Sequence, residues 1–214
     1  MITPLLHSLI VAILATFFSF ILMFPLAYKS VFKAYRGRTL VEIILLLPLV
    51  LPPTIVGLYL LQIFGKYGIF GFLGAHLIFS LSGAVLATTI ITFPLVYQGL
   101  KAGFLGVPQE LIDVARVYGA NRRQLLIHVI FPSAWSMVLA SILLAFCRAL
   151  GEFGASLMVA GYIPGKTDTL ANSIYFAVQN GNNNQALLLS FLNIMIGIVI
   201  LGLVLILGKQ HSKK

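Results

Sequence analysis

The chain has 214 residues, of which 60% are hydrophobic and only 9% are charged, and its mean hydropathy is +1.04. These values lie far from those of soluble globular domains and indicate an integral membrane protein. The net charge of +9 would suit a nucleic-acid partner, but the basic residues occupy short intervals between apolar runs, where fixing membrane topology explains them better. We therefore expect no nucleic-acid binding. The single cysteine, Cys147, excludes an intrachain disulfide and a cysteine metal cluster.

Apolar runs predict an all-α, polytopic membrane protein in which residues 1–214 form one domain. Residues 1–28 contain no Lys, Arg, Asp or Glu, which exceeds the ~20 residues needed to cross the hydrocarbon core. A cleaved signal peptide fits less well, because the basic residues follow this run instead of preceding it. About five spans are predicted in all, near residues 3–28, 43–64, 81–100, 133–153 and 186–208.

Three segments depart from plain spanning helices. Pro48, Pro52 and Pro53 interrupt the second span, so we expect a kinked helix whose bend serves either packing or a pore-lining break. Residues 65–80 are rich in Gly and aromatic side chains and predict an interfacial connector. Residues 154–185 end in a polar run and predict a partly buried gate or an external hairpin.

Within that third segment, the sequence predicts a turn followed by a helix. Pro164 and Gly165 are typical of a turn, with Lys166 and Asp168 beside it. Asn172 to Val178 are expected to form a short helix.

Lys and Arg residues divide unequally between the two sides that five spans create. One side receives two, Lys66 and Lys166. The other receives eleven: Lys29, Lys33, Arg36, Arg38, Lys101, Arg116, Arg122, Arg123, Lys209, Lys213 and Lys214. Because basic residues favour the cytoplasmic side, this bias places the N-terminus outside, the C-terminus inside and the loop 107–132 in the cytoplasm.

The loop 107–132 is the longest polar interval and predicts a helix-turn-helix outside the bilayer. Pro108 suits a first helical turn, and Glu110 and Asp113 lie near the positive end of that helix. Gly119 is a natural stop and is expected to need a positive φ. The first helix should therefore cover residues 108–118.

A second helix of the loop should begin after Asn121, whose side chain can cap it. Arg122 and Arg123 are expected to face water, and an apolar run leads through Pro132 to the fourth span.

Few polar groups lie inside the spans. Arg148 and Glu152 form the only intramembrane ionisable pair, one helical turn apart, and either stabilise a bend at Gly151 and Gly154 or contribute to an anion contact or gate. Threonines of the third span, Thr88 and Thr92 among them, are further pore candidates, although such residues usually hold helices together.

Two stretches resemble a known family. Permease subunits of prokaryotic ATP-binding cassette (ABC) importers carry a cytoplasmic "EAA" loop, in which two small residues follow an acidic one and a Gly and a Pro follow at fixed spacing. Asp113 to Ala115, Gly119 and Pro132 match that spacing, with Asp-Val in place of the consensus Glu-Ala. Residues 148–169, RALGEFGASLMVAGYIPGKTDT, and LPLVLPPTIVG at 47–57 are similar to molybdate and sulfate permeases, most of all to the molybdate branch.

The resemblance implies a type I (MetI-like) importer permease fold in a prokaryotic plasma (inner) membrane. It implies a homodimer with the pore between its two copies, two cytoplasmic ATPase subunits, and an external binding protein that delivers the oxyanion. The implied cargo is molybdate, with tungstate and sulfate or thiosulfate as alternatives. Coupling to the ATPase would be carried by Glu110, Asp113, Ala115, Arg116, Gly119, Asn121, Arg122 and Pro132.

The sequence also argues against other function classes. No GxxxxGK[ST] loop is present, so ATP and its Mg²⁺ would bind to the partner ATPase and this chain is expected to need no cofactor and to be no enzyme. The four histidines lack metal-ligand spacing. A self-contained secondary transporter or channel should carry a proton relay or a selectivity ring, and an intramembrane enzyme should carry a paired nucleophile and base.

Overall fold

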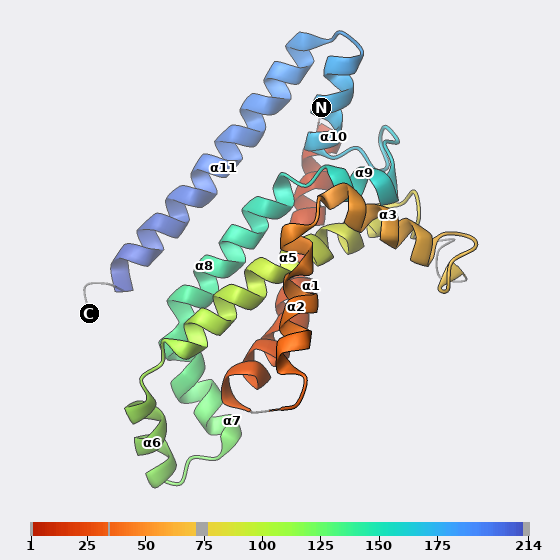
Figure 1. The fold of residues 1–214 in the computed structure, drawn as a ribbon. Coiled ribbons are helices and arrows are strands. Elements are labelled where there is room, and N and C mark those ends of the chain that lie inside the picture. The colour runs from red at the N-terminus through yellow and green to blue at the C-terminus, as the bar shows by residue number, and fades with distance from the viewer. Residues whose placement is uncertain (1, 34, 72–76, 212–214) are drawn as a thin grey trace.

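The computed structural model describes residues 2–33, 35–71 and 77–211, and within these ranges the regular structure is entirely helical (Figure 1). The helices are α1 (Ile2–Phe32), α2 (Arg38–Val50), α3 (Pro53–Phe64), α5 (Leu81–Leu105), α6 (Gln109–Val117), α7 (Arg122–Leu125), the π-helix η1 (Leu126–Ile130), α8 (Phe131–Leu150), α9 (Gly154–Ala160), α10 (Leu170–Gln179) and α11 (Asn183–His211). The all-α prediction is confirmed.

Four helical units of the described chain are long and apolar enough to cross a membrane, and a fifth span exists if α2 and α3 are counted together. The four are α1, α5, the unit Arg122–Leu150 and the first part of α11, Asn183–Leu203. The helix that carries the fourth predicted span begins earlier than residue 133, because the second helix of the loop runs into it without a break.

The second span differs from its prediction. In place of one kinked helix over 43–64, α2 and α3 meet at 115°. Leu51, before a proline, is extended (ψ 141°), and Pro52 has ψ 134°, so two consecutive residues leave the helical region. Two prolines in a row remove two backbone donors and disfavour a helical residue before them, which turns a kink into a break.

Helix α5 is the centre of the bundle and packs along α1 and α8. Small residues make this possible: Ala12 and Ala15 of α1 and Ala84 and Ala87 of α5 are fully buried. A Cβ added to Gly99 would lie 2.0 Å from Ser141 Cβ of α8, so only glycine permits that approach. Close backbone packing at small residues is the usual basis of helix association in lipid.

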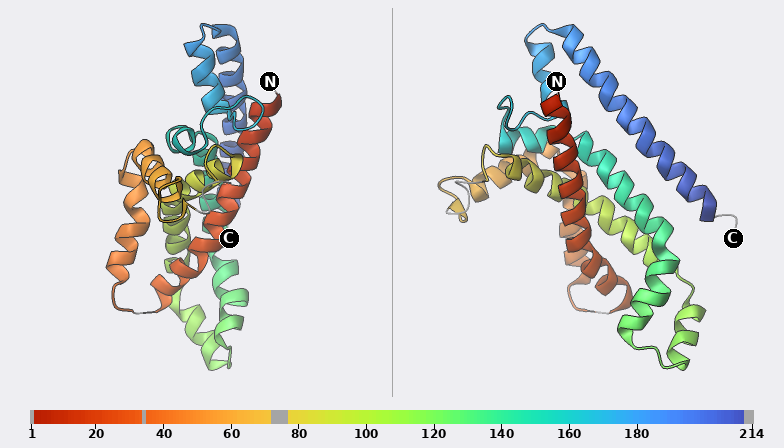
Figure 2. Two further views of the ribbon diagram at one scale, coloured as in Figure 1. Left: turned by 90° about the vertical axis from the view of Figure 1, so that its right-hand side faces the viewer. Right: turned by 180° about the vertical axis from the view of Figure 1, so that it is seen from behind.

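The molecule is elongated, with a helical hairpin at each end (Figure 2). The α6–α7 hairpin projects at one end, and the α10–α11 turn lies at the other, near the N-terminus. Helix α11 lies at the edge, against α8 and α10. Its outer face exposes Leu187, Phe191, Ile194 and Ile198 by 57–70%, as expected for a surface that meets lipid or a partner.

Candidate functional site

The α6–α7 hairpin begins with a helix that ends in a Schellman motif. Gly119 N donates to Arg116 O at 2.9 Å and Ala120 N donates to Ala115 O at 3.0 Å, while Gly119 has φ +81°. This conformation suits glycine because it has no Cβ to clash. The predicted stop at Gly119 is confirmed, and the helix starts one residue later than predicted, since Pro108 precedes its first turn.

The second helix of the hairpin begins with the cap that the sequence predicts. Asn121 Oδ1 accepts from the backbone N–H groups of Arg123 and Gln124 at 3.1 and 2.9 Å, and Gln124 Oε1 accepts from Asn121 N at 2.9 Å. This reciprocal capping box satisfies backbone donors that a helix start leaves free. Arg122 and Arg123 are exposed, as predicted.

From this cap the chain continues as one helical unit to Leu150. The turn over Leu126–Ile130 is π-helical and leads directly into α8, whose second residue is Pro132. A proline has no N–H, and its ring would clash with the carbonyl four residues earlier in a regular α-helix, so a wider turn at this place accommodates it. The second helix of the hairpin and α8 thereby form a single helical unit of 29 residues, roughly 40 Å long.

Apolar contacts attach the hairpin to the bundle, and its tip is left free. Ile112 of α6 and Leu125 of α7 are 1% and 6% exposed and belong to the same core cluster as Phe104 of α5. At the tip, Val117 and Tyr118 are 86% and 87% exposed. Two large exposed side chains on one turn are suited to fill a groove on a partner.

The coupling residues predicted from sequence lie on this one hairpin and the start of α8. Glu110, Asp113 and Arg116 are exposed or nearly so, and Arg116 Nη1 lies 3.2 Å from Asp113 Oδ1. Both side chains of this pair are 58% exposed, so it contributes little to stability. Ala115 packs against the core cluster. What these residues contact in a partner stays a prediction.

Arg148 and Glu152 form the predicted ion pair where α8 ends. Arg148 Nη1 lies 2.8 Å from Glu152 Oε2, and the Glu152 side chain is 1% exposed while that of Arg148 is 35% exposed. Glu152 Oε1 also accepts from Ala155 N at 2.9 Å, so the same carboxylate caps α9. Pairing with a cation and a backbone donor is what makes a buried carboxylate tolerable.

The two glycines predicted beside this pair lie at the break between α8 and α9. Gly151 follows the last residue of α8, and Gly154 is the first residue of α9. A Cβ on Gly154 would meet Pro53 Cβ at 3.3 Å and Thr54 Cγ2 at 3.1 Å. The α8–α9 break therefore packs against the α2–α3 break. The two breaks can approach this closely because Gly154 has no side chain.

The two pore threonines predicted from sequence are both fully buried. Thr92 Oγ1 donates to Thr88 O at 3.0 Å and lies 2.6 Å from Ser19 Oγ of α1. These contacts join α1 to α5, which is the packing role that threonines usually have in membrane helices. A contact with substrate stays a prediction, and the burial gives it no support.

The sequence analysis missed a polar cluster around Glu42. Its carboxylate accepts from Ser30 (2.6 Å), Arg38 (3.0 Å), Tyr97 (3.2 Å) and Lys101 (2.9 Å), and so joins α1, α2 and α5. The i,i+4 spacing of Arg38 and Glu42 was a readable signal. The contacts from α1 and α5 join residues far apart in the sequence, and no local pattern reveals them.

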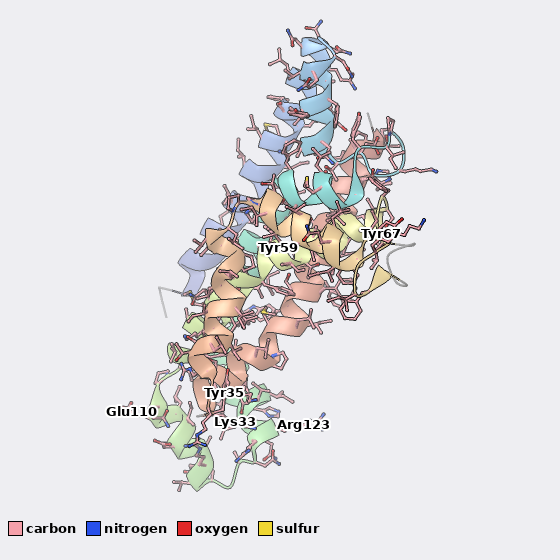
Figure 3. The ribbon with its side chains drawn as sticks, turned by 45° about the vertical axis from the view of Figure 1, so that its right-hand side comes forward. Lys33, Tyr35, Tyr59, Tyr67, Glu110 and Arg123 are labelled. Carbon is pink, nitrogen blue, oxygen red and sulfur yellow. The ribbon has the colours of Figure 1, made fainter. Side chains whose placement is uncertain are left out.

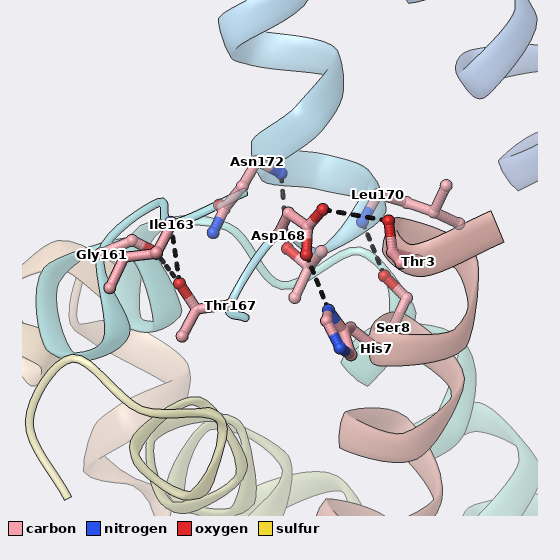
Figure 4. A network of polar contacts seen from close by, with 10 residues as sticks. Thr3, His7, Ser8, Gly161, Ile163, Thr167, Asp168, Leu170 and Asn172 are labelled. Atoms are coloured by element: carbon pink, nitrogen blue, oxygen red, sulfur yellow. Dashed lines mark hydrogen bonds and ion pairs between the residues drawn. The ribbon is translucent and has the colours of Figure 1, made fainter. Parts of the chain in front are cut away.

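A second missed cluster lies at the opposite end and is shown in Figure 4. His7 Nδ1 is 2.7 Å from Asp168 Oδ1, and Thr3 Oγ1 donates to Asp168 Oδ2 at 3.3 Å. Ser8 Oγ accepts from Leu170 N at 2.7 Å, at the first residue of α10. Asp168 is 4% exposed. These contacts connect the start of α1 to the loop before α10. The sequence shows that these residues are polar, but it does not show that they lie together.

Comparison with known proteins places this architecture in a family. Residues 5–212 match the family described as "binding-protein-dependent transport system inner membrane component". The chain is 43% identical to the permease protein YvgM of Bacillus subtilis over 158 residues, 72% of this chain and 70% of that protein. It is 34% identical to the molybdenum transport system permease protein ModB of Escherichia coli, over 90% of this chain and 86% of that protein.

Solved structures show the same fold. An inward-facing structure of the MetNI methionine ABC transporter superposes with a TM-score of 0.76, at 16% sequence identity, covering 98% of this chain and 94% of that one. The shared fold agrees with the family match, which extends over residues 5–212. The chain belongs to the family of inner-membrane components of binding-protein-dependent transport systems.

Proposed function

We propose that the chain is the membrane-spanning permease of an ATP-driven molybdate importer. It provides the translocation pathway and is coupled to a separate ATPase by alternating access. The observation that carries the proposal is the family match over 5–212 together with relatives such as the E. coli protein, which is named for molybdenum transport. The permease itself hydrolyses no ATP; ATP and Mg²⁺ bind to the partner subunit.

The hairpin provides a physical route for the coupling. Val117 and Tyr118 dock on the ATPase, and the apolar anchors Ile112 and Leu125 keep the hairpin fixed to the bundle. Because the unit Arg122–Leu150 is continuous, movement of the tip is carried along α8 to the Arg148–Glu152 break. A conformational change needs such a differential contact between states to bias it.

The functional unit in this proposal is a homodimer with the pore between its two copies. The apolar face of α2, where Leu40, Ile43, Ile44 and Leu47 are 46–62% exposed, is available to contact lipid or the second copy. Two ATPase subunits bind on the cytoplasmic side and an oxyanion-binding protein binds on the outer side. The eleven-to-two distribution of basic residues supports a cytoplasmic hairpin and C-terminus.

The decisive experiment is an oxyanion titration of the reconstituted complex. Permease, ATPase and binding protein are assembled in proteoliposomes, and ATP hydrolysis and uptake are measured with molybdate, tungstate and sulfate. The proposal is supported if molybdate stimulates ATP hydrolysis and is taken up at lower concentrations than tungstate or sulfate. If sulfate acts at the lowest concentration, the chain belongs to the sulfate branch. Uptake by the permease alone, driven by an ion gradient, would instead identify a secondary transporter. Tight molybdate binding to the isolated permease would move Arg148 from a structural role to a substrate contact.

A further inference from the structure

A basic pocket lies between the end of α1 and the hairpin. It has a volume of about 360 Å³ and is lined by Tyr28, Phe32, Lys33, Ile112, Arg116, Ala120, Arg122, Leu125 and Ile130. One wall belongs to α1 and the residue after it, and the other to α6, α7 and η1. Figure 3 shows Lys33 at the same end of the molecule as Glu110 and Arg123 of the hairpin.

The charge of this pocket is positive and incompletely paired. Three cations, Lys33, Arg116 and Arg122, line it, and no Asp or Glu does. Arg116 has a partner in Asp113, but among the side chains that the structure describes, neither Lys33 nor Arg122 has a carboxylate within ion-pair distance. Two cations from separate elements line this pocket together with apolar side chains, and this combination favours an anionic group there.

The other lining residues indicate which anion fits. Five of them are large and apolar or aromatic: Tyr28, Phe32, Ile112, Leu125 and Ile130. A free tetrahedral dianion is strongly hydrated and would gain little from such walls, because it needs hydrogen-bond donors on most of its oxygens. A lipid headgroup combines a phosphate with an apolar remainder. The pocket also lies at the end of α1, a helix that is long and apolar enough to cross a membrane.

We infer that this pocket binds the phosphate of an anionic phospholipid at the cytoplasmic interface. Lys33 and Arg122 contact the phosphate, and the glycerol and upper acyl carbons lie along the half-buried side chains of Tyr28 and Phe32. The bound lipid bridges α1 and the hairpin, so it stabilises the hairpin in the position from which it docks. Basic pockets between membrane helices on the cytoplasmic side are suited to such headgroups.

The test measures lipid binding by the purified full-length permease in neutral detergent, by native mass spectrometry with added phosphatidylglycerol or phosphatidylcholine. The test variant is Lys33→Gln with Arg122→Gln. The matched control is Lys29→Gln with Arg123→Gln, which removes the same charge from the same two elements but from residues outside the pocket lining. Phosphatidylglycerol affinity should fall about thirtyfold in the test variant, at roughly fivefold per cation, and less than about threefold in the control.

A second measurement uses the unmodified permease and so does not depend on whether the variant folds. A photoactivatable phosphatidylglycerol added to the unmodified permease should crosslink to peptides that contain Phe32 and Leu126 to Ile130, and phosphatidylcholine should not compete with it. Crosslinks confined to α11 would overturn the inference. So would equal losses of affinity in the test and control variants, which would indicate a diffuse surface attraction.

Two further outcomes would identify a different occupant and also overturn the inference. If molybdate or inorganic phosphate binds to the lipid-free permease and the test variant abolishes that binding, the pocket holds a free oxyanion. If assembly with the ATPase expels phosphatidylglycerol from the pocket, the occupant in the complex is a group of the ATPase. No readout requires transport, so failure here leaves the proposed cargo and coupling untouched.

Discussion

The two ends of the molecule are held by different kinds of contact. At the hairpin end, the tip is exposed and two apolar residues, Ile112 and Leu125, attach it to the core. At the opposite end, buried polar side chains hold the loop before α10 against the start of α1, through the contacts of Asp168 and Ser8. Among the described side chains, those of the hairpin meet the bundle through apolar contacts, whereas the loop before α10 is held by several hydrogen bonds of fixed geometry. The polar cluster around Glu42 joins α1, α2 and α5 and does not include the hairpin.

This difference has a mechanical consequence. Apolar contacts are non-directional, so a hairpin anchored by them can shift with α8 as a rigid unit without breaking a bond. A buried polar network loses much of its stability when one member is displaced, because the remaining groups are left unpaired. We expect the hairpin end to transmit movement and the opposite end to keep its geometry.

The largest effect should come from Gly119. Replacement by Pro removes the donor to Arg116 O and is incompatible with φ +81°, so the turn must change direction. In Gly119→Arg the added Cβ meets no atom within 4 Å, but the positive φ strains the backbone by about 1 kcal/mol. Both variants should abolish transport and substrate-stimulated ATPase activity in the reconstituted complex, while yield and membrane insertion stay normal because the spans are untouched.

Gly37→Arg is the matched control for this prediction. Gly37 has φ +82° and no atom within 4 Å of an added Cβ, so the local strain is the same, but it precedes α2 and lies outside the hairpin. Normal coupling in Gly37→Arg with lost coupling in Gly119→Arg locates the effect in the tip. Normal uptake and stimulated ATPase activity in Gly119→Arg would show that this glycine only eases local packing.

The second effect concerns the end of α8. Arg148→Gln leaves the buried carboxylate of Glu152 without its cation, which should lower stability by about 3 kcal/mol. The double variant Arg148→Gln with Glu152→Gln should recover most of the loss, because a glutamine oxygen can still accept from Ala155 N. Thermal unfolding of the purified permease measures both.

Uptake then separates the two roles left open by the sequence. If the pair is structural, the double variant should transport molybdate at close to the normal rate per molecule. A double variant that is stable but inactive would show that Arg148 contacts the anion or operates a gate.

A smaller effect is expected at the opposite end. Asp168→Asn weakens the contacts to His7 and Thr3 and should lower stability by about 1–3 kcal/mol. Hydrogen exchange should increase in residues 161–170, while ATPase coupling stays normal. Lys166→Gln, an exposed neighbour on the same loop, serves as the control and should change neither. Lost coupling in a stable Asp168→Asn variant would contradict the division between the two ends.

The hairpin end and the opposite end also differ in how much of their structure the sequence predicts. The hairpin follows from short-range chemistry: the glycine stop at Gly119 and the cap at Asn121 act within a few residues, and both are confirmed. The extent of the α2–α3 break depends on how the halves pack, so the prolines predicted a bend without its size. The Asp168 contacts join residues 161 and 165 positions apart, and no local pattern encodes such a pairing.

The last prediction tests which end faces the cytoplasm. Cysteines at Lys33, Asn121 and Lys213 in a Cys147→Ser background should be protected from an impermeant thiol reagent in intact cells, whereas Lys166→Cys should react. The physical basis is the excess of basic residues on one side. Lys33, Asn121 and Lys166 are exposed, so protection there reflects the membrane and not burial; Lys213 lies outside the described residues.

Inside-out vesicles provide the control, since the pattern of labelling must reverse in them. If position 121 reacts in intact cells, the hairpin is outside, and it then meets the wrong compartment for an ATPase. In that case the exposed Val117 and Tyr118 would need another partner, and both the coupling role and the inner-leaflet lipid pocket would fall with the topology.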